Sequence, residues 1–233
     1  MIDFNPQKLT FENVDRYHIK RSIFQFLSSK SEVFRGDLLD VGCGEMPYKN
    51  EILSNRKVTK YVGLDIHGAL EYKKGIKPDY LWDGIKMPFE DESFDSSFAT
   101  EVLEHCPDPL LTLKEINRVL KPESPLILTV PFLWPTHESP FDFYRYTPFA
   151  IQNLLEQSSF KDIEINCLGG WDASTAQMIS LWLKRRGFSK RIQKFLFIVL
   201  KPFILNLYKK DKIRPAFNDQ SMFTNLGVIA WKK

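Results

Sequence analysis

The 233-residue sequence predicts a single α/β domain in which a mostly parallel sheet carries helices on both faces. Two observations support this prediction. Strand-like and helix-like stretches alternate along the chain, and the length suits one such domain with a sizeable core. The chain divides into an N-terminal helical region (1–35), a core (36–168), a basic and apolar helical region (169–220) and a closing strand (221–233).

Apolar periodicity places the individual elements. The strands expected from short apolar runs are 37–41, 60–66, 80–83, 94–100, 126–130, 161–168 and 226–231. The helices expected from helical spacing are 11–30, 109–120, 147–158 and a longer helical region, 171–208. Lys121-Pro122 ends the second of these helices, while Thr147 and Pro148 supply an N-cap and a first turn for the third.

Composition narrows the class of protein. The 43% hydrophobic and 26% charged fractions are those of an ordinary globular protein. Cys43, Cys106 and Cys167 are far apart in the sequence, so neither a disulfide framework nor a structural zinc site is expected. The first ten residues lack the apolar stretch of a secretion signal, and no segment reaches the roughly 18–20 apolar residues that span a bilayer. We therefore expect a cytoplasmic protein.

The ends of the predicted strands carry the most informative residues. The first strand runs into Gly42-Cys43-Gly44, where glycines allow a sharp turn and a close approach to a ligand. The second strand ends in Asp65, whose carboxylate can accept hydrogen bonds from both hydroxyls of a ribose. Near the third strand end, Asp83-Gly84-Ile85 places a carboxylate beside backbone amides and can read an adenine edge, unless Asp83 simply forms a turn. Together these features predict an adenosine site.

The same residues distinguish between adenosine cofactors. A dinucleotide loop has a third glycine where this chain has Pro47, which lacks the N–H that would face a phosphate. This disfavours NAD. The acidic residues Asp40, Asp65, Asp83 and Glu101 suit a ligand with cationic ammonium and sulfonium centres.

Four ordered segments carry a family resemblance. LLDVGCGEMPY, YVGLDI, MPFEDESFDSSFATEVLEHCPDP and LKEINRVLKPESPLILTVP resemble successive motifs of class I S-adenosylmethionine-dependent methyltransferases of the type-11 domain group. The resemblance covers roughly 36–168 and implies a Rossmann-like fold with seven strands, of which the last is antiparallel. It also implies S-adenosylmethionine as the cofactor, S-adenosylhomocysteine as the product, and no metal. The residues assigned to the cofactor site are Asp40, Gly42, Cys43, Gly44, Asp65, Ile66, Asp83, Gly84, Ile85, Glu101 and His105.

The sequence departs from the family pattern in two places. The third glycine of the loop is missing, which leaves the loop conformation open, and KPES replaces the usual Lys-Pro-Gly-Gly turn. His105 is expected to open the helix after the fourth strand, or to shield the cofactor, rather than to act as a catalyst. Two other classes stay open: an NAD-dependent oxidoreductase, and a non-catalytic relative that keeps the fold as a scaffold or binding module.

The long loop 131–147 is dense in aromatic and titratable residues, at the place where a methyl acceptor would sit. His137 is the candidate general base for transfer to a hydroxyl, although it could instead pair with Glu138 or Asp142. Asp142 and Arg145 could bind the substrate or pair with each other. The predicted substrate-binding residues are Trp134, His137, Glu138, Asp142, Tyr144 and Arg145. The loop also resembles methyltransferases of bacterial cell-surface polysaccharide synthesis, which implies a glycan or other small-molecule acceptor.

The segment from Lys184 to Arg214 contains eleven basic residues and one acidic residue, Asp211. Its apolar stretch 195–208 is too short to span a bilayer, and Lys201-Pro202 is expected to interrupt it. It could lie on an anionic membrane surface, at the inner face of the membrane. Alternatively it could form an apolar lid or a homodimer surface. Nucleic acid is not expected, because no recognised module is present and the aromatic side chains of the segment look buried.

Overall fold

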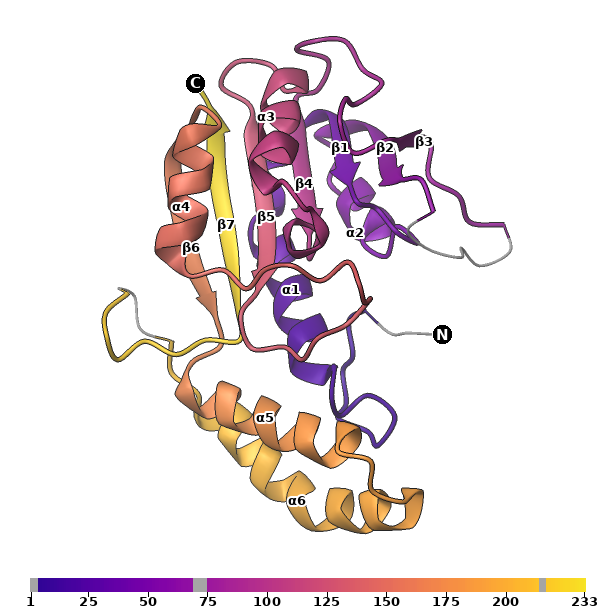
Figure 1. Ribbon diagram of the computed structural model, residues 1–233, viewed down its shortest axis with the longest axis vertical. Helices are drawn as coiled ribbons and strands as arrows, with labels where there is room; N and C mark the ends of the chain where they lie inside the picture. The colour runs from indigo at the N-terminus through magenta and orange to yellow at the C-terminus, as the bar shows by residue number, and fades with distance from the viewer. Residues whose placement is uncertain (1–3, 69–74, 214–216) are drawn as a thin grey trace.

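The computed structural model describes residues 4–68, 75–213 and 217–233 (Figure 1). In chain order the strands are β1 (Gly36–Val41), β2 (Val58–Ile66), β3 (Tyr80–Trp82), β4 (Ser96–Thr100), β5 (Pro125–Pro131), β6 (Phe160–Leu168) and β7 (Asn225–Lys232). The helices are α1 (Tyr17–Ser29), α2 (Lys49–Ser54), α3 (Pro109–Val119), α4 (Pro148–Gln157), α5 (Trp171–Arg185) and α6 (Lys190–Lys210).

Within the described residues these strands form one seven-stranded sheet in the order β3-β2-β1-β4-β5-β7-β6. The first five strands in this order run parallel to one another, and β7 is antiparallel to both β5 and β6. The prediction of a mostly parallel sheet with an antiparallel last strand is therefore confirmed. The chain leaves β1 toward β2 on one side and returns to β4 on the other, so the topological switch point lies between β1 and β4.

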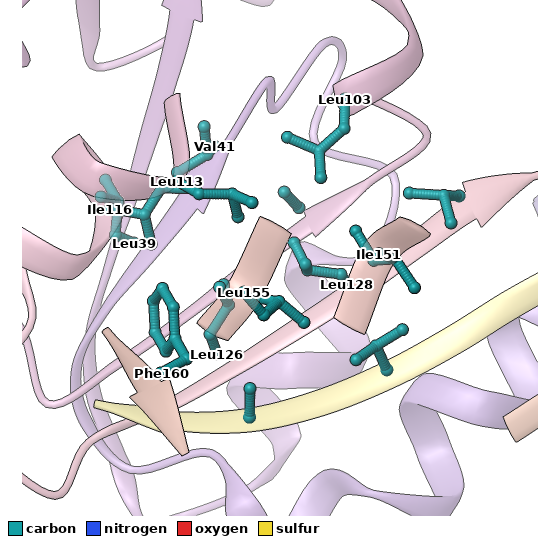
Figure 2. Close-up of a cluster of buried hydrophobic side chains, with 14 of the residues drawn as sticks. Leu39, Val41, Leu103, Leu113, Ile116, Leu126, Leu128, Ile151, Leu155 and Phe160 are labelled. Atoms are coloured by element: carbon teal, nitrogen blue, oxygen red, sulfur yellow. The ribbon is translucent and has the colours of Figure 1, made fainter. Parts of the chain in front are cut away.

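Helices cover both faces of the sheet, as expected. Successive strand residues point to opposite faces, so Leu38 joins one apolar cluster and Leu39 the other. Leu39 packs in the cluster that includes α3 and α4, and Figure 2 shows the side chains of these helices meeting those of the strands. Leu38 packs in the cluster on the opposite face, which includes α1 and α2. This double cover holds the carboxyl ends of the strands in fixed positions.

The helical region 171–208 is a pair of helices, α5 and α6, which lie side by side at one end of the molecule (Figure 1). The expected interruption at Lys201-Pro202 is wrong, because α6 continues through Pro202. Proline removes one backbone hydrogen bond, but burial of Phe197 and Ile204 in a third apolar cluster holds the helix together. No helix among the described residues is long and apolar enough to cross a membrane.

The expected burial of aromatic residues in this segment is also wrong in part. Phe197 is buried, but Phe195 and Phe203 are 64% and 50% exposed. Arg214, the last residue of the predicted basic segment, lies outside the described residues.

Two further local differences have clear physical reasons. The first helix begins at Tyr17 rather than near residue 11, because Asn13 accepts a hydrogen bond from the Thr10 N–H and fixes a turn there. The KPES segment forms a turn in which Ser124 N donates to Lys121 O and Glu123 adopts a φ of 58°, a conformation that glycine would take more easily.

Candidate active site

The turn after β1 has the shape that its glycines predict. Gly42 and Gly44 have φ of 65° and 51°, in the left-handed region. A Cβ on Gly42 would lie 2.5 Å from Val102 Cγ2, so this position has no room for a side chain. Where the third glycine is missing, Met46 adopts a φ of 51° and its N–H donates to Cys43 O at 2.8 Å. The loop thus closes as a tight turn before Pro47.

Two carboxyl groups lie beside this turn. Asp65, 5% exposed, accepts hydrogen bonds from the N–H of Gly44 at 3.0 Å and of Ile66 at 2.8 Å. Asp40 is buried and accepts a hydrogen bond from the Tyr61 hydroxyl. Burial raises the pKa of Asp40 well above its usual range. The predicted residues at the ends of β1 and β2 therefore form one connected group.

A cavity of about 770 Å³ opens beside the turn, at the carboxyl ends of β1 and β4. The predicted residues that line it are Asp40, Gly42, Cys43, Gly44, Glu101, His105, Trp134, His137 and Glu138. The predicted residues that do not line it are Asp65, Ile66, Asp83, Gly84, Ile85, Asp142, Tyr144 and Arg145. The cavity is thus lined both by the glycine turn and by the loop 131–147.

The predicted adenine-binding residues lie together outside this cavity. A Cβ on Gly84 would lie 3.2 Å from Ile66 Cδ1, and both Ile66 and Ile85 are exposed. Asp83 is exposed and accepts hydrogen bonds from the N–H of Ile85 at 2.8 Å and of Lys86 at 3.1 Å, which lower its pKa. Asp83 thus forms the turn of the alternative interpretation, close in the chain to the exposed side chain of Ile85.

Glu101 follows β4 in a strained conformation, with a φ of 54°. Its Oε2 accepts a hydrogen bond from Asn225 Nδ2 at 2.8 Å, and its Oε1 is buried. Burial raises the pKa of Glu101. Thr129, Asn225 and the charge of Lys20 oppose this shift, and the carboxyl group lines the cavity, where it suits a cationic or hydrogen-bonding ligand.

Three cationic residues of the cavity wall were not identified from the sequence: Arg16, Lys20 and Arg185. Lys20 Nζ lies 3.7 Å from the centre of the Phe4 ring, and burial lowers the Lys20 pKa to about 8 although Glu101 opposes the shift. The available signal was the four-residue spacing of Arg16 and Lys20, which puts both on one face of a helix. Arg185 gave no such signal, because it arrives from α5.

The loop 131–147 is braced by an ion pair. Asp142, whose side chain is 4% exposed, accepts hydrogen bonds from two nitrogens of Arg145 at 2.7 and 2.8 Å and from His137 N at 3.0 Å. Arg145 Nε also donates to Trp134 O at 3.3 Å. Asp142 and Arg145 therefore pair with each other, as the alternative interpretation had it. Tyr144 is directed elsewhere and donates to Pro107 O.

Two histidines meet at the edge of the cavity, with the ring centres of His105 and His137 4.7 Å apart. His105 ends a 3₁₀ turn, Leu103–His105, so the expectation that it opens the next helix is wrong; Asp108 caps that helix. His105 Nδ1 donates to Phe141 O at 2.6 Å. His137 Nδ1 lies 3.3 Å from Asp142 Oδ2, while burial and the neighbouring His105 lower the pKa of His137. His137 is thus neutral near pH 7 and able to accept a proton.

Glu104 lies beneath these histidines and is fully buried, with neither carboxylate oxygen hydrogen-bonded among the described residues. Burial raises its pKa well above the usual range. Glu104, His105 and His137 each offer one atom within 4.8 Å of the others, an arrangement of ligand types that could hold a metal ion.

The fold and this site define a class of protein, the class I methyltransferases. The profile of the methyltransferase domain family matches residues 39–128. The ubiquinone/menaquinone biosynthesis C-methyltransferase UbiE of Bartonella henselae is 30% identical over 183 residues, which cover 64% of this chain and 69% of that protein. The chain belongs to the class I S-adenosylmethionine-dependent methyltransferase family, whose cofactor is S-adenosylmethionine.

Other relatives differ in length and substrate. A tRNA U34 carboxymethyltransferase of Nautilia profundicola is 30% identical over 146 residues, 55% of this chain and 48% of that protein. The chain spans about half the length of this and of a second such carboxymethyltransferase, from Campylobacter curvus.

Solved structures share the fold at low sequence identity. A methyltransferase of Thermotoga maritima has a TM-score of 0.58 and 13% identity over 96% of this chain and 98% of that one. Phosphoethanolamine N-methyltransferase 2 of Haemonchus contortus, in complex with S-adenosyl-L-methionine, has a TM-score of 0.55 and 16% identity over 97% of this chain and 60% of that one.

Proposed function

We propose that the chain transfers a methyl group from S-adenosylmethionine to a hydroxyl oxygen of a small-molecule or glycan acceptor. The observation that carries the proposal is the shared cavity, which is lined both by Gly42 and Gly44 of the turn and by Trp134, His137 and Glu138 of the loop. A cofactor beside the glycine turn and an acceptor under the loop would be held in contact, and such alignment supplies much of the acceleration of a two-substrate reaction.

The residues of the turn fit the cofactor. Glu101 lines the cavity and can accept a hydrogen bond from an ammonium group, and the cations Arg16 and Lys20, which also line it, suit a carboxylate. Asp65 already accepts two backbone hydrogen bonds, but a carboxylate has about four acceptor positions and can still bind ribose hydroxyls. Bound S-adenosylmethionine supplies an electrophilic methyl group on a sulfonium centre.

His137 is the proposed base. Its ring lines the cavity and is neutral near pH 7, because burial and His105 lower its pKa, so a ring nitrogen can take the proton from the acceptor hydroxyl. His137→Ala should lower turnover at least tenfold, within the range of general-base catalysis, while the dissociation constant for S-adenosylmethionine stays within about twofold. A loss of less than about threefold with unchanged cofactor binding would assign His137 to loop structure alone.

A glycan is the proposed acceptor class, and the cytoplasm, at the inner face of a membrane, is the proposed location. The resemblance of the loop to methyltransferases of cell-surface polysaccharides supports this choice. The cavity wall also carries both an indole, Trp134, and a carboxylate, Glu138. Because the names of two relatives specify tRNA and quinone biosynthesis, a screen for the acceptor should include these classes beside glycans.

Calorimetric titration tests the proposal at its base. Wild-type protein should bind S-adenosylmethionine and S-adenosylhomocysteine with micromolar affinity and leave NAD unbound, and Asp65→Ala should bind at least tenfold more weakly. Asp95→Ala is the matched control, because Asp95 also accepts a backbone hydrogen bond, from Asp37 N, but does so near the start of β1 rather than at its carboxyl end. Binding of neither sulfur ligand would leave the chain as a scaffold that has kept the fold.

A further inference from the structure

Helix α6 is apolar on two opposite faces. Its inner face buries Phe197 and Ile204 in the cluster formed with α5 and residues 9–17. A surface helix ordinarily carries polar side chains on its outer face. The outer face of α6 instead carries large apolar side chains at helical spacing, with exposed fractions from 38% to 71%: Ile192, Phe195, Ile198, Val199, Phe203 and Leu205. We call this set the outer apolar face. Six exposed large apolar side chains on one helix indicate an apolar occupant.

The ends of the outer apolar face are cationic. Lys190, Arg191 and Lys194 stand at the start of α6, and Lys209 and Lys210 at its end, all of them exposed. The helix contains no Asp or Glu. At 1.5 Å per residue, its 21 residues extend over about 30 Å. When the helix lies parallel to a surface, both cationic ends can contact that surface.

This combination distinguishes between occupants. A second copy of the chain, paired through this face in either direction, would bring cationic ends together and gain no opposite charge. A nucleic acid would neutralise the cations but leave the apolar side chains in water. An anionic bilayer satisfies both, because acyl chains accept the apolar side chains and the headgroups above them carry negative charge.

We propose that the outer apolar face of α6 docks flat on an anionic membrane surface. The inner face of α6 packs on α5, and Arg185, the last residue of α5, lines the cavity. Docking would therefore hold the cavity wall close to the lipid, where an acceptor carried on a lipid could reach it. Membrane binding itself does not depend on the proposed methyl transfer.

Co-sedimentation with vesicles tests the proposal. The 233-residue chain should bind phosphatidylcholine vesicles that contain about one third phosphatidylglycerol at least tenfold more tightly than phosphatidylcholine alone, and salt should weaken this binding. Phe195→Ser and Ile198→Ser should each lower binding about tenfold, and Arg191→Gln with Lys210→Gln about fivefold per charge. Phe149→Ser, which replaces a phenylalanine 70% exposed on α4, is the matched control and should bind as wild type.

Three results would overturn the proposal. Wild-type protein that stays in the supernatant with anionic vesicles would do so, as would serine variants of α6 that bind as tightly as wild type. A stable dimer in light scattering that Phe195→Ser dissociates, without vesicle binding by either protein, would assign the face to a second copy. The variants lie outside the cavity, so unchanged S-adenosylmethionine binding verifies that they are folded. A failure of methyl transfer would leave vesicle binding intact.

Discussion

Replacement of Asp142 by Asn should loosen the loop 131–147 without loss of the cofactor site. The carboxylate is 4% exposed and accepts three hydrogen bonds, two from Arg145 and one from His137 N. Asn keeps the shape but loses the charge and one acceptor. Charge-assisted hydrogen bonds contribute about 1.5–3 kcal/mol each, and the 25% exposure of Arg145 reduces the pair, so we expect a loss of about 2–3 kcal/mol.

Urea unfolding measures the loss, and hydrogen exchange locates it. Faster exchange should be confined to the loop, and S-adenosylmethionine affinity should stay within about twofold, because the glycine turn follows β1 whereas the loop follows β5. Asp91→Asn is the matched control. Asp91 also pairs with an arginine, Arg118, at 2.8 Å, but it is 74% exposed and should cost less than about 1 kcal/mol.

Comparison of the two variants tests whether burial strengthens the ion pair of Asp142 with Arg145. Equal destabilisation by Asp142→Asn and Asp91→Asn would show that burial does not strengthen the loop pair. The Arg145 hydrogen bond holds the pKa of Asp142 well below its usual range, so the stability from this pair is present above about pH 4 and is lost only below it. Loop order should therefore not change between pH 5 and pH 8 through this group.

Three further predictions concern the turn, a buried histidine and the cavity lysine. Gly42→Ala should destabilise the protein by about 2–4 kcal/mol in urea unfolding, through backbone strain and the contact with Val102. Gly68→Ala is the control and should cost only about 1 kcal/mol, because Gly68 has a φ of 76° but open space around it. Equal costs would contradict the steric argument. Burial lowers the pKa of His18 from 6.5 to about 4, so the unfolded chain takes up the proton at a higher pH than the folded one. The free energy of unfolding should therefore fall by up to about 3 kcal/mol as the pH drops through this range. His18→Gln should flatten the plot of stability against pH, and identical plots for the two proteins would contradict this. Lys20 loses its charge above its pKa of about 8, so the affinity of the wild type for S-adenosylmethionine, measured by calorimetry, should weaken above this pH. Lys20→Arg should keep its affinity to higher pH. An equal loss of affinity in both proteins would show that Lys20 does not bind the carboxylate.

The parallel core could be predicted because its signals are local. Glycines that need a positive φ directly follow an apolar run at Gly42 and Gly44, and Asp65 ends the next strand. Such patterns depend on neighbours in the chain, and the sheet brings their ends to one edge. The tight turn at Met46 could not be predicted, because a non-glycine residue in the left-handed region is held there by its surroundings.

The remaining wall of the cavity depends on contacts between distant segments. Asn225 meets Glu101 across 124 positions of the chain, and Arg185 reaches the cavity from α5. No periodicity or spacing encodes such contacts. At Pro202 a local rule predicted a break in the helix, but contacts with distant segments keep the helix continuous. For Asp142 and Arg145 the sequence allowed two partners, and only geometry distinguished them.

The position of β7 in the sheet has a consequence for synthesis on the ribosome. β5 and β6 do not pair with each other; each pairs with β7, which follows both in the chain. Until residues 225–232 have left the exit tunnel, β6 has no neighbouring strand among the described residues and the apolar edge of β5 stays open, a state that invites association with other nascent chains. Asn225, at the start of the same strand, is also the brace of Glu101. Insertion of one strand therefore closes the sheet and completes this wall of the pocket in a single event, so a chain interrupted before it would have neither.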